Sequence, residues 1–171
     1  LVRAARQAGF ETIGDCEAPW YAMAFQAGAR AGALDAPPPY AALLRWLDWG
    51  RANSQNTTPA IGAGWILCRR AAGERGDTPA IAALAEEFAR ELPPTARHDL
   101  LLEYLGLTAL QACGDARAAA WARVLGDLLP SIQHPAADGC PAGSWDPDPV
   151  WGSAGGRVGA TALAVLILNA A

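Results

Sequence analysis

Apolar and amphipathic stretches alternate along this chain of 171 residues. The apolar stretches carry hydrophobic side chains almost all round a helical turn, as in DLLLEYLGLTALQACG (99–114). The intervening stretches, such as AALLRWLDWGRAN (41–53) and AIAALAEEFAREL (80–92), gather Arg and Glu on one face. A helix that is apolar all round is enclosed by neighbours, whereas an amphipathic helix covers a core with one side. The pattern therefore predicts an all-α protein with an inner and an outer layer of helices.

Prolines and glycines divide the pattern into separate helices. Pro37, Pro38 and Pro39 separate two of them, and Pro79 stands at the first turn of another, where proline is well tolerated. No segment shows the period-two alternation of a strand. The connections are short, so consecutive helices are expected to be antiparallel neighbours. The predicted helices are 1–8, 17–33, 38–53, 59–74, 79–91, 98–113, 116–132 and 157–169.

Three glycines are equally spaced along the chain, and each closes an apolar stretch: Gly32, Gly73 and Gly114. A fourth apolar stretch, GGRVGATALAVLILNAA (155–171), follows after a longer interval if Ala171 takes the place of the glycine. This lengthening corresponds to an insertion of about 16 residues into a repeat of stacked helical hairpins. Hairpins of inner and outer helices form an α/α toroid when they close into a ring and an α-solenoid when they do not.

The predicted organisation is a single domain over 1–171, of about three and a half hairpins, which on its own makes only part of a toroid. The chain begins without Met inside one predicted helix and ends inside another. We therefore expect it to be the C-terminal part of a longer chain.

Composition removes several functions. The 13 basic residues are all Arg, which excludes chemistry that needs a lysine, such as Schiff-base formation or a P-loop. The net charge is −4 and the arginines are scattered, so no nucleic-acid partner is expected. The longest apolar run, Val158–Leu168, is too short to span a bilayer, so no transmembrane segment is predicted. No cofactor is implied.

The cysteines are widely spaced, at Cys16, Cys68, Cys113 and Cys140, without a CxxC pair. This spacing excludes a zinc knuckle, and no metal site is predicted. Cys68 and Cys113 fall on apolar helix faces and are expected to be buried thiols. A disulfide such as Cys113–Cys140 is the alternative if the protein is extracytoplasmic, so an extracytoplasmic and a cytoplasmic location both stay open.

The segment 133–157 reads QHPAADGCPAGSWDPDPVWGSAGGR and is predicted to be a long loop. Gln133, Trp145, Asp146 and Trp151 are its expected structural residues, because loops of this length are functional or tightly packed. Asp146 and Asp148 are either an acid pair or turn residues that cap backbone groups. Arg157 either binds an anionic head group or pairs with Asp146 or Asp99.

Two strings in this region carry a family resemblance. Gly143-Ser144-Trp145-Asp146-Pro147 and the run Gly155-Gly156-Arg157-Val158, followed by Ala160-Thr161-Ala162-Leu163, are similar to the closing repeat of bacterial prenyltransferase/squalene-oxidase repeat proteins. Trp20-Tyr21-Ala22-Met23-Ala24 resembles an earlier element of the same proteins. The resemblance covers 18–171 and is closest over 143–165. It implies the α/α-toroid fold shared by squalene–hopene cyclases, prenyltransferase β-subunits and complement-type thioester domains.

The chemical motifs of that superfamily are missing from this sequence. The DxDD acid cluster of the cyclases is reduced to Asp146-Pro147-Asp148, and the CGEQ element of thioester domains does not occur. Neither His98 nor His134 stands in a zinc-ligand motif of the prenyltransferases. We therefore predict a non-catalytic scaffold that binds a protein partner or an apolar ligand such as an isoprenoid or lipid. The alternatives are a terpene-cyclase-like or prenyltransferase-like enzyme with its acid motif outside this segment, and an unrelated solenoid.

The resemblance places aromatic residues of the inner helices around an axial cavity. The candidate ligand-binding residues are Trp20, Trp65, Glu103, Tyr104 and Arg157. For the aromatic residues the alternative is core packing. Glu103 points either into the cavity or towards a neighbouring loop, and His98 is expected at the surface or at a helix cap. No catalytic residue is predicted.

Overall fold

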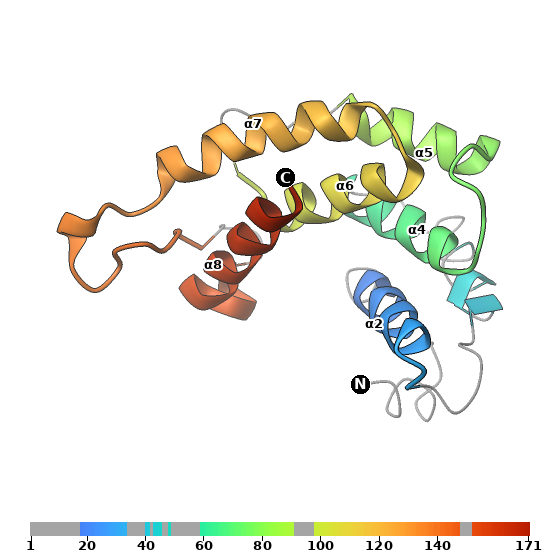
Figure 1. The fold of residues 1–171 in the computed structure, drawn as a ribbon, viewed down its shortest axis with the longest axis horizontal. Coiled ribbons are helices and arrows are strands. Elements are labelled where there is room, and N and C mark those ends of the chain that lie inside the picture. Colours follow the sequence, from blue (N-terminus) through green and yellow to red (C-terminus); the bar gives the residue numbers. More distant parts are fainter. Residues whose placement is uncertain are drawn as a thin grey trace. The chain divides into compact units, whose positions relative to one another are not determined.

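The computed structural model describes residues 18–33, 40–41, 43–45, 48, 59–90, 98–147 and 152–171 (Figure 1). Within these residues every regular element is a helix and no strand occurs, which confirms the predicted all-α class. Residues 40, 41, 43–45 and 48 are helical, in agreement with the helix expected over 38–53. The expected helix at 1–8 lies outside the described residues.

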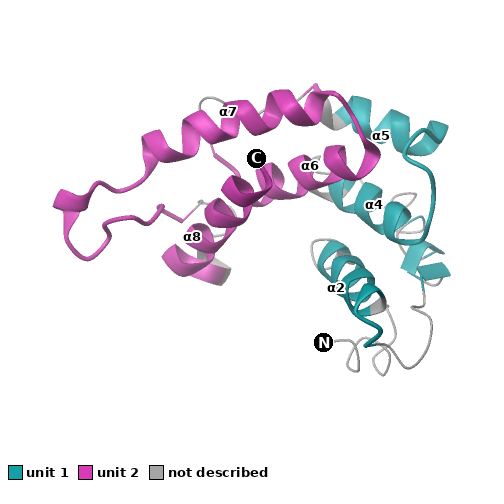
Figure 2. Ribbon diagram, viewed as in Figure 1, with its two compact units in different colours: residues 1–88 teal, residues 89–171 magenta. Residues whose placement is uncertain are grey.

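The chain forms two compact units, Leu1–Phe88 and Ala89–Ala171 (Figure 2). The first contains α2 (Ala18–Arg30), α4 (Pro59–Ala71) and α5 (Pro79–Ala89) up to Phe88. Both Pro59 and Pro79 occupy the first helical position, where a missing N–H costs nothing. The single-domain expectation stays a prediction.

In the first unit α2 packs against α4. The contact is close because Gly64 has no side chain. A Cβ atom built at Gly64 would lie 2.5 Å from Cγ of Pro19. Phe25 is buried, and its ring meets the ring of Tyr40 edge to face, with centroids 6.2 Å apart.

The second unit contains α6 (Leu100–Cys113), α7 (Arg117–Ile132), the short 3-10 helix η2 (Ala136–Asp138) and α8 (Gly152–Ala170). The helices α6, α7 and α8 all pack on one another. Asp99 caps α6 by accepting a hydrogen bond from the Leu102 amide, at 2.9 Å. Gly156 breaks α8 with φ 53° and ψ −155°, a conformation open only to glycine. Regular helix therefore begins again at Arg157, which is the first residue of the helix predicted from the sequence.

The equal spacing of the glycines in the sequence recurs in the local structure of the apolar helices α2, α4 and α6. α2, α4 and α6 begin at 18, 59 and 100, and their terminal glycines all have positive φ. The residue after each glycine donates its amide to a carbonyl five residues earlier, which is the Schellman arrangement. These bonds are Ala33 to Gly28 at 2.8 Å, Glu74 to Arg69 at 3.0 Å and Asp115 to Leu110 at 3.0 Å.

One core position also recurs with this period. Phe25, Ile66 and Leu107 stand at the same place in their helices, and none is more than 1% exposed. Ala164, which follows Leu107 at the same interval as Ala171 follows Gly114, is also fully buried. The closing glycine and the buried residue of each helix are therefore separated by the same number of residues, and both recur with the same spacing along the chain.

Candidate functional site

The loop 133–147 leaves α7 and returns towards α8, and it is held together by its own backbone. The amide of His134 donates to the carbonyl of Ser144, and the amide of Gly143 donates to the carbonyl of His134, both at 2.9 Å. The side-chain amide of Gln133 adds a third bond, to the carbonyl of Gly143 at 2.8 Å. Gly139 and Gly143 adopt positive φ, which lets the chain reverse. These bonds join the outgoing and returning arms into a narrow hairpin-like loop.

Trp145 anchors the returning arm to the helices. It is 3% exposed, and its indole N–H donates to the carbonyl of Leu129 at 2.8 Å. That carbonyl belongs to the last turn of α7, where carbonyls lack a partner within the helix. The Trp145 amide also donates to the hydroxyl of Thr161 in α8, at 3.3 Å. Trp145 thus ties the loop to both α7 and α8.

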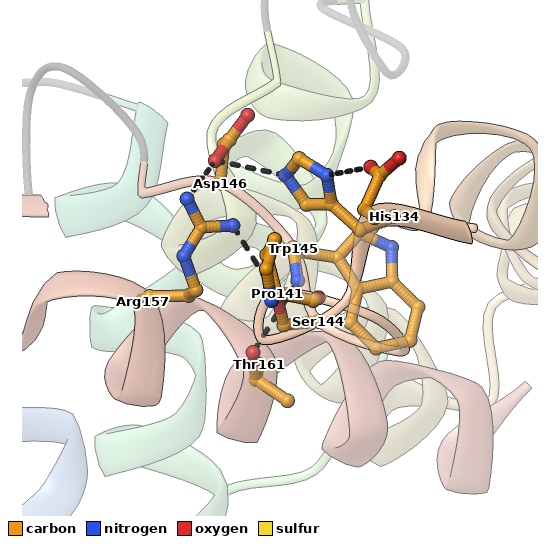
Figure 3. Close-up of polar contacts among 8 residues, drawn as sticks. His134, Pro141, Ser144, Trp145, Asp146, Arg157 and Thr161 are labelled. Carbon is orange, nitrogen blue, oxygen red and sulfur yellow. Dashed lines mark hydrogen bonds and ion pairs between the residues drawn. The ribbon is translucent and has the colours of Figure 1, made fainter. Parts of the chain in front are cut away.

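His134 lies between two carboxylates (Figure 3). Its Nδ1 is 2.7 Å from Oδ2 of Asp138 in η2, and its Nε2 is 3.0 Å from Oδ1 of Asp146. The same Asp146 oxygen is 2.7 Å from Nη2 of Arg157 in α8. Arg157 therefore makes one of the two pairs expected for it, and the four side chains form a continuous chain of polar contacts.

These contacts raise the pKa of His134 and lower the pKa of Asp146. Hydrogen bonds to Asp138 and then to Asp146 raise the pKa of His134 above its usual 6.5, although Arg157 opposes this. The bond from His134, followed by the charge of Arg157, lowers the pKa of Asp146. Both changes favour an imidazolium paired with carboxylates.

The hydrogen bonds within this cluster do not include a contact between a nucleophile and a base. The Ser144 hydroxyl donates to the carbonyl of Pro141 at 2.5 Å and accepts from Arg157 at 3.3 Å. A catalytic serine would instead donate to the imidazole, whose nitrogens here meet carboxylates. Among the described residues no group of three or more His, Cys, Asp or Glu side chains is placed to hold a metal ion.

An open hollow of about 720 Å³ lies beside the loop. It is bordered by the end of α7 and by both arms of the loop: Pro130, Ser131, Gln133, His134, Pro135, Ala136, Ala142 and Gly143. His134 is the titratable residue in this lining. The predicted loop residue Trp151 and the acid-pair candidate Asp148 lie outside the described residues.

Glu103 and His98 form a second polar pair, at the start of α6. Glu103 is fully buried, and its Oε1 lies 3.3 Å from Nδ1 of His98. His98 precedes the helix and is partly exposed. Glu103 therefore contacts the segment that precedes α6, which is one of the two arrangements expected for it.

The remaining candidate residues fall in both units. In the first, Trp20 is 38% exposed and Trp65 is 5% exposed. In the second, Tyr104 is half-buried beside Glu103 in α6. A shared axial cavity that brings these side chains together with Arg157 stays a prediction.

Cys68, Cys113 and Cys140 are not in disulfides, so the alternative disulfide between Cys113 and Cys140 is not formed. Burial raises the pKa of Cys68 to about 12, as expected for an enclosed thiol. Cys113 is only partly enclosed and Cys140 is exposed. Cys16 lies outside the described residues.

No family model, curated protein or solved structure matches this chain. The helices that the structure describes also include none long and apolar enough to cross a membrane. The helices of the described residues define the molecule as an all-α protein.

Proposed function

We propose that this chain is a non-catalytic helical-repeat scaffold of the α/α-toroid type, of the kind found in bacterial prenyltransferase/squalene-oxidase repeat proteins. The observation that carries the proposal is the common register of α2, α4 and α6. They share their spacing, their glycine-closed ends and a buried position at Phe25, Ile66 and Leu107. Repeats of this kind present extended surfaces, and their usual task is binding.

The exposed side of α8 supports a protein partner. Val158, Ala162, Val165 and Leu166 follow the spacing of one helix face, and all four are exposed. Val158 is 82% exposed. In the register that matches Ala164 with Leu107, the corresponding positions of α6 include Leu101, Leu105 and Ala109, which are all buried. The last inner helix thus leaves open a face that the preceding inner helix has covered, and exposed apolar patches often mark interaction sites.

The engagement of the loop side chains supports binding over chemistry. His134, Asp146 and Arg157 contact one another, and Trp145 joins the loop to α7 and α8. In this scaffold Trp145 holds the base of the loop on α7 and α8.

One experiment separates a protein-binding from an apolar-ligand-binding scaffold. The purified protein is extracted with organic solvent, and the extract is analysed by mass spectrometry for lipids or isoprenoids. We expect no lipid at near-stoichiometric amount from protein that circular dichroism shows to be folded. A stoichiometric isoprenoid would instead make the apolar ligand the function and Trp20, Trp65 and Tyr104 its candidate contacts.

The buried pair Glu103–His98 favours one alternative, a terpene-cyclase-like or prenyltransferase-like enzyme. A carboxyl group in an apolar helix beside an imidazole is an arrangement that acid–base chemistry uses. The test is to incubate the protein with squalene and with isoprenyl diphosphates and to analyse the products. Product formation by the wild-type protein would overturn the non-catalytic proposal, and its loss in Glu103→Gln would assign the chemistry to the Glu103–His98 pair.

A further inference from the structure

The ring of His134 joins parts of the second unit that are otherwise well separated along the chain. Nδ1 meets Asp138 in η2, and Nε2 meets Asp146 on the returning arm. Asp146 in turn contacts Arg157 of α8. The side-chain contacts that connect the tip of the loop with α8 therefore include the imidazole of His134 (Figure 3).

This connection needs both ring nitrogens to donate. An ionised carboxylate only accepts hydrogen bonds, and a neutral imidazole has a single N–H. When His134 loses a proton, one nitrogen turns a lone pair towards a carboxylate, and that contact is lost. Whichever contact it is, the tip and α8 are no longer joined through the ring.

We propose that His134 is a pH-dependent latch, which holds the loop 133–147 closed when the imidazole is charged and releases the η2 tip when it is neutral. Release also changes the hollow beside α7, because both arms of the loop border it. The proposal concerns this loop alone and does not depend on the scaffold function.

The sign of the effect follows from the groups around the ring. Asp138 and Asp146 favour the charged ring, and Arg157 disfavours it, with the net result that the pKa of His134 is raised. A raised pKa in the closed state means that closure is fully supported below the ordinary imidazole value of 6.5. The support is lost as the pH rises through the higher value of the closed loop.

The test combines two measurements by nuclear magnetic resonance on the whole chain, from about pH 5.5 to about pH 8.5. The first follows the imidazole signals of His134 and gives its pKa. The second gives the hydrogen-exchange protection of the amides of Asp138 and Gly143, corrected for the intrinsic effect of pH on exchange. These amides bond to the carbonyls of Pro135 and His134, so they report the closed loop.

We expect His134 to titrate above 6.5 and the corrected protection to fall between pH 6.5 and the measured pKa of His134. Linkage requires the total fall to be roughly tenfold for each unit by which the pKa is raised. In His134→Gln the corrected protection should not change with pH. In Asp138→Asn the pKa of His134 should decrease and the fall should shrink, while His98→Gln is the matched control that leaves the fall unchanged.

Three results would overturn the latch. The first is a His134 that titrates at or below 6.5, and the second is protection that stays constant through its midpoint. The third is a fall that persists in His134→Gln. The wild-type chain gives the first two results by itself, so the test does not rely on a variant that folds.

Discussion

The glycines that close α2, α4 and α6 allow a stability prediction that has an internal control. Gly114 ends α6 with φ 66°, and a Cβ atom placed there would meet nothing within 4 Å. Gly114→Ala therefore introduces no steric contact with another residue. Its cost comes from the left-handed backbone conformation, which alanine adopts with difficulty.

The magnitude follows from two opposing terms. The left-handed conformation costs an L-residue about 1 to 2 kcal/mol. Alanine also restricts the unfolded chain, which returns about 0.4 to 1 kcal/mol. The net expectation is a loss of about 1 kcal/mol in the free energy of unfolding. If the backbone moved away instead, the bonds from the amides of Gly114 and Asp115 to the carbonyl of Leu110 would be weakened, with a similar loss.

Gly126 provides the matched control. It lies inside α7, and its added Cβ would also meet nothing within 4 Å. In a helix interior the same substitution is favourable by about 0.5 to 1 kcal/mol. The free energies of unfolding of Gly114→Ala and Gly126→Ala should therefore differ by about 2 kcal/mol, with wild type between them.

The assay is urea denaturation followed by far-ultraviolet circular dichroism, with the slope m held in common. Gly32→Ala and Gly73→Ala should change stability in the same direction as Gly114→Ala, because these glycines also have positive φ. A Gly114→Ala protein as stable as wild type would refute the reasoning. So would a destabilised Gly126→Ala, because the added Cβ meets nothing at either site and the two differ in backbone conformation.

Three further outcomes follow from burial and hydrogen bonding. Leu107→Ala should lower the free energy of unfolding by about 2 to 5 kcal/mol in the same assay, because the side chain is fully buried. Trp145→Phe should cost about 1 to 3 kcal/mol, because the carbonyl of Leu129 loses its indole donor. A maleimide reagent should label the exposed Cys140 in the folded protein at neutral pH, and Cys68 only after unfolding, because Cys68 is buried and its pKa is raised to about 12.

Much of the local structure could be predicted because the chain marks its helix boundaries. Pro59 and Pro79 begin helices at the expected residues, and Gly73 and Gly114 close them. These signals act within a single turn, so no knowledge of packing is needed to use them. The helix α8 begins earlier than predicted. A helical turn from Gly152 precedes the break at Gly156, whereas the sequence predicted a start at residue 157.

The role of His134 could not be predicted, although the residue itself was visible. Its contact with Asp138, four residues later, has a local spacing. Its contact with Asp146 depends on chain reversals at Gly139 and Gly143, and sequence patterns do not give the path of such a loop. The proposed axial cavity has the same difficulty, because Trp20 and Glu103 belong to different helices whose meeting depends on tertiary arrangement.

The loop between α7 and α8 also has a consequence for engineering. Its base is fixed by Trp145, while residues 135–140 at its tip are exposed. Lengthening a loop costs only about 0.6 kcal/mol for each doubling of its length, provided its ends stay in place. A foreign peptide inserted at the tip would therefore be displayed on the helices without altering their common register, which makes this protein a natural framework for presenting grafted sequences.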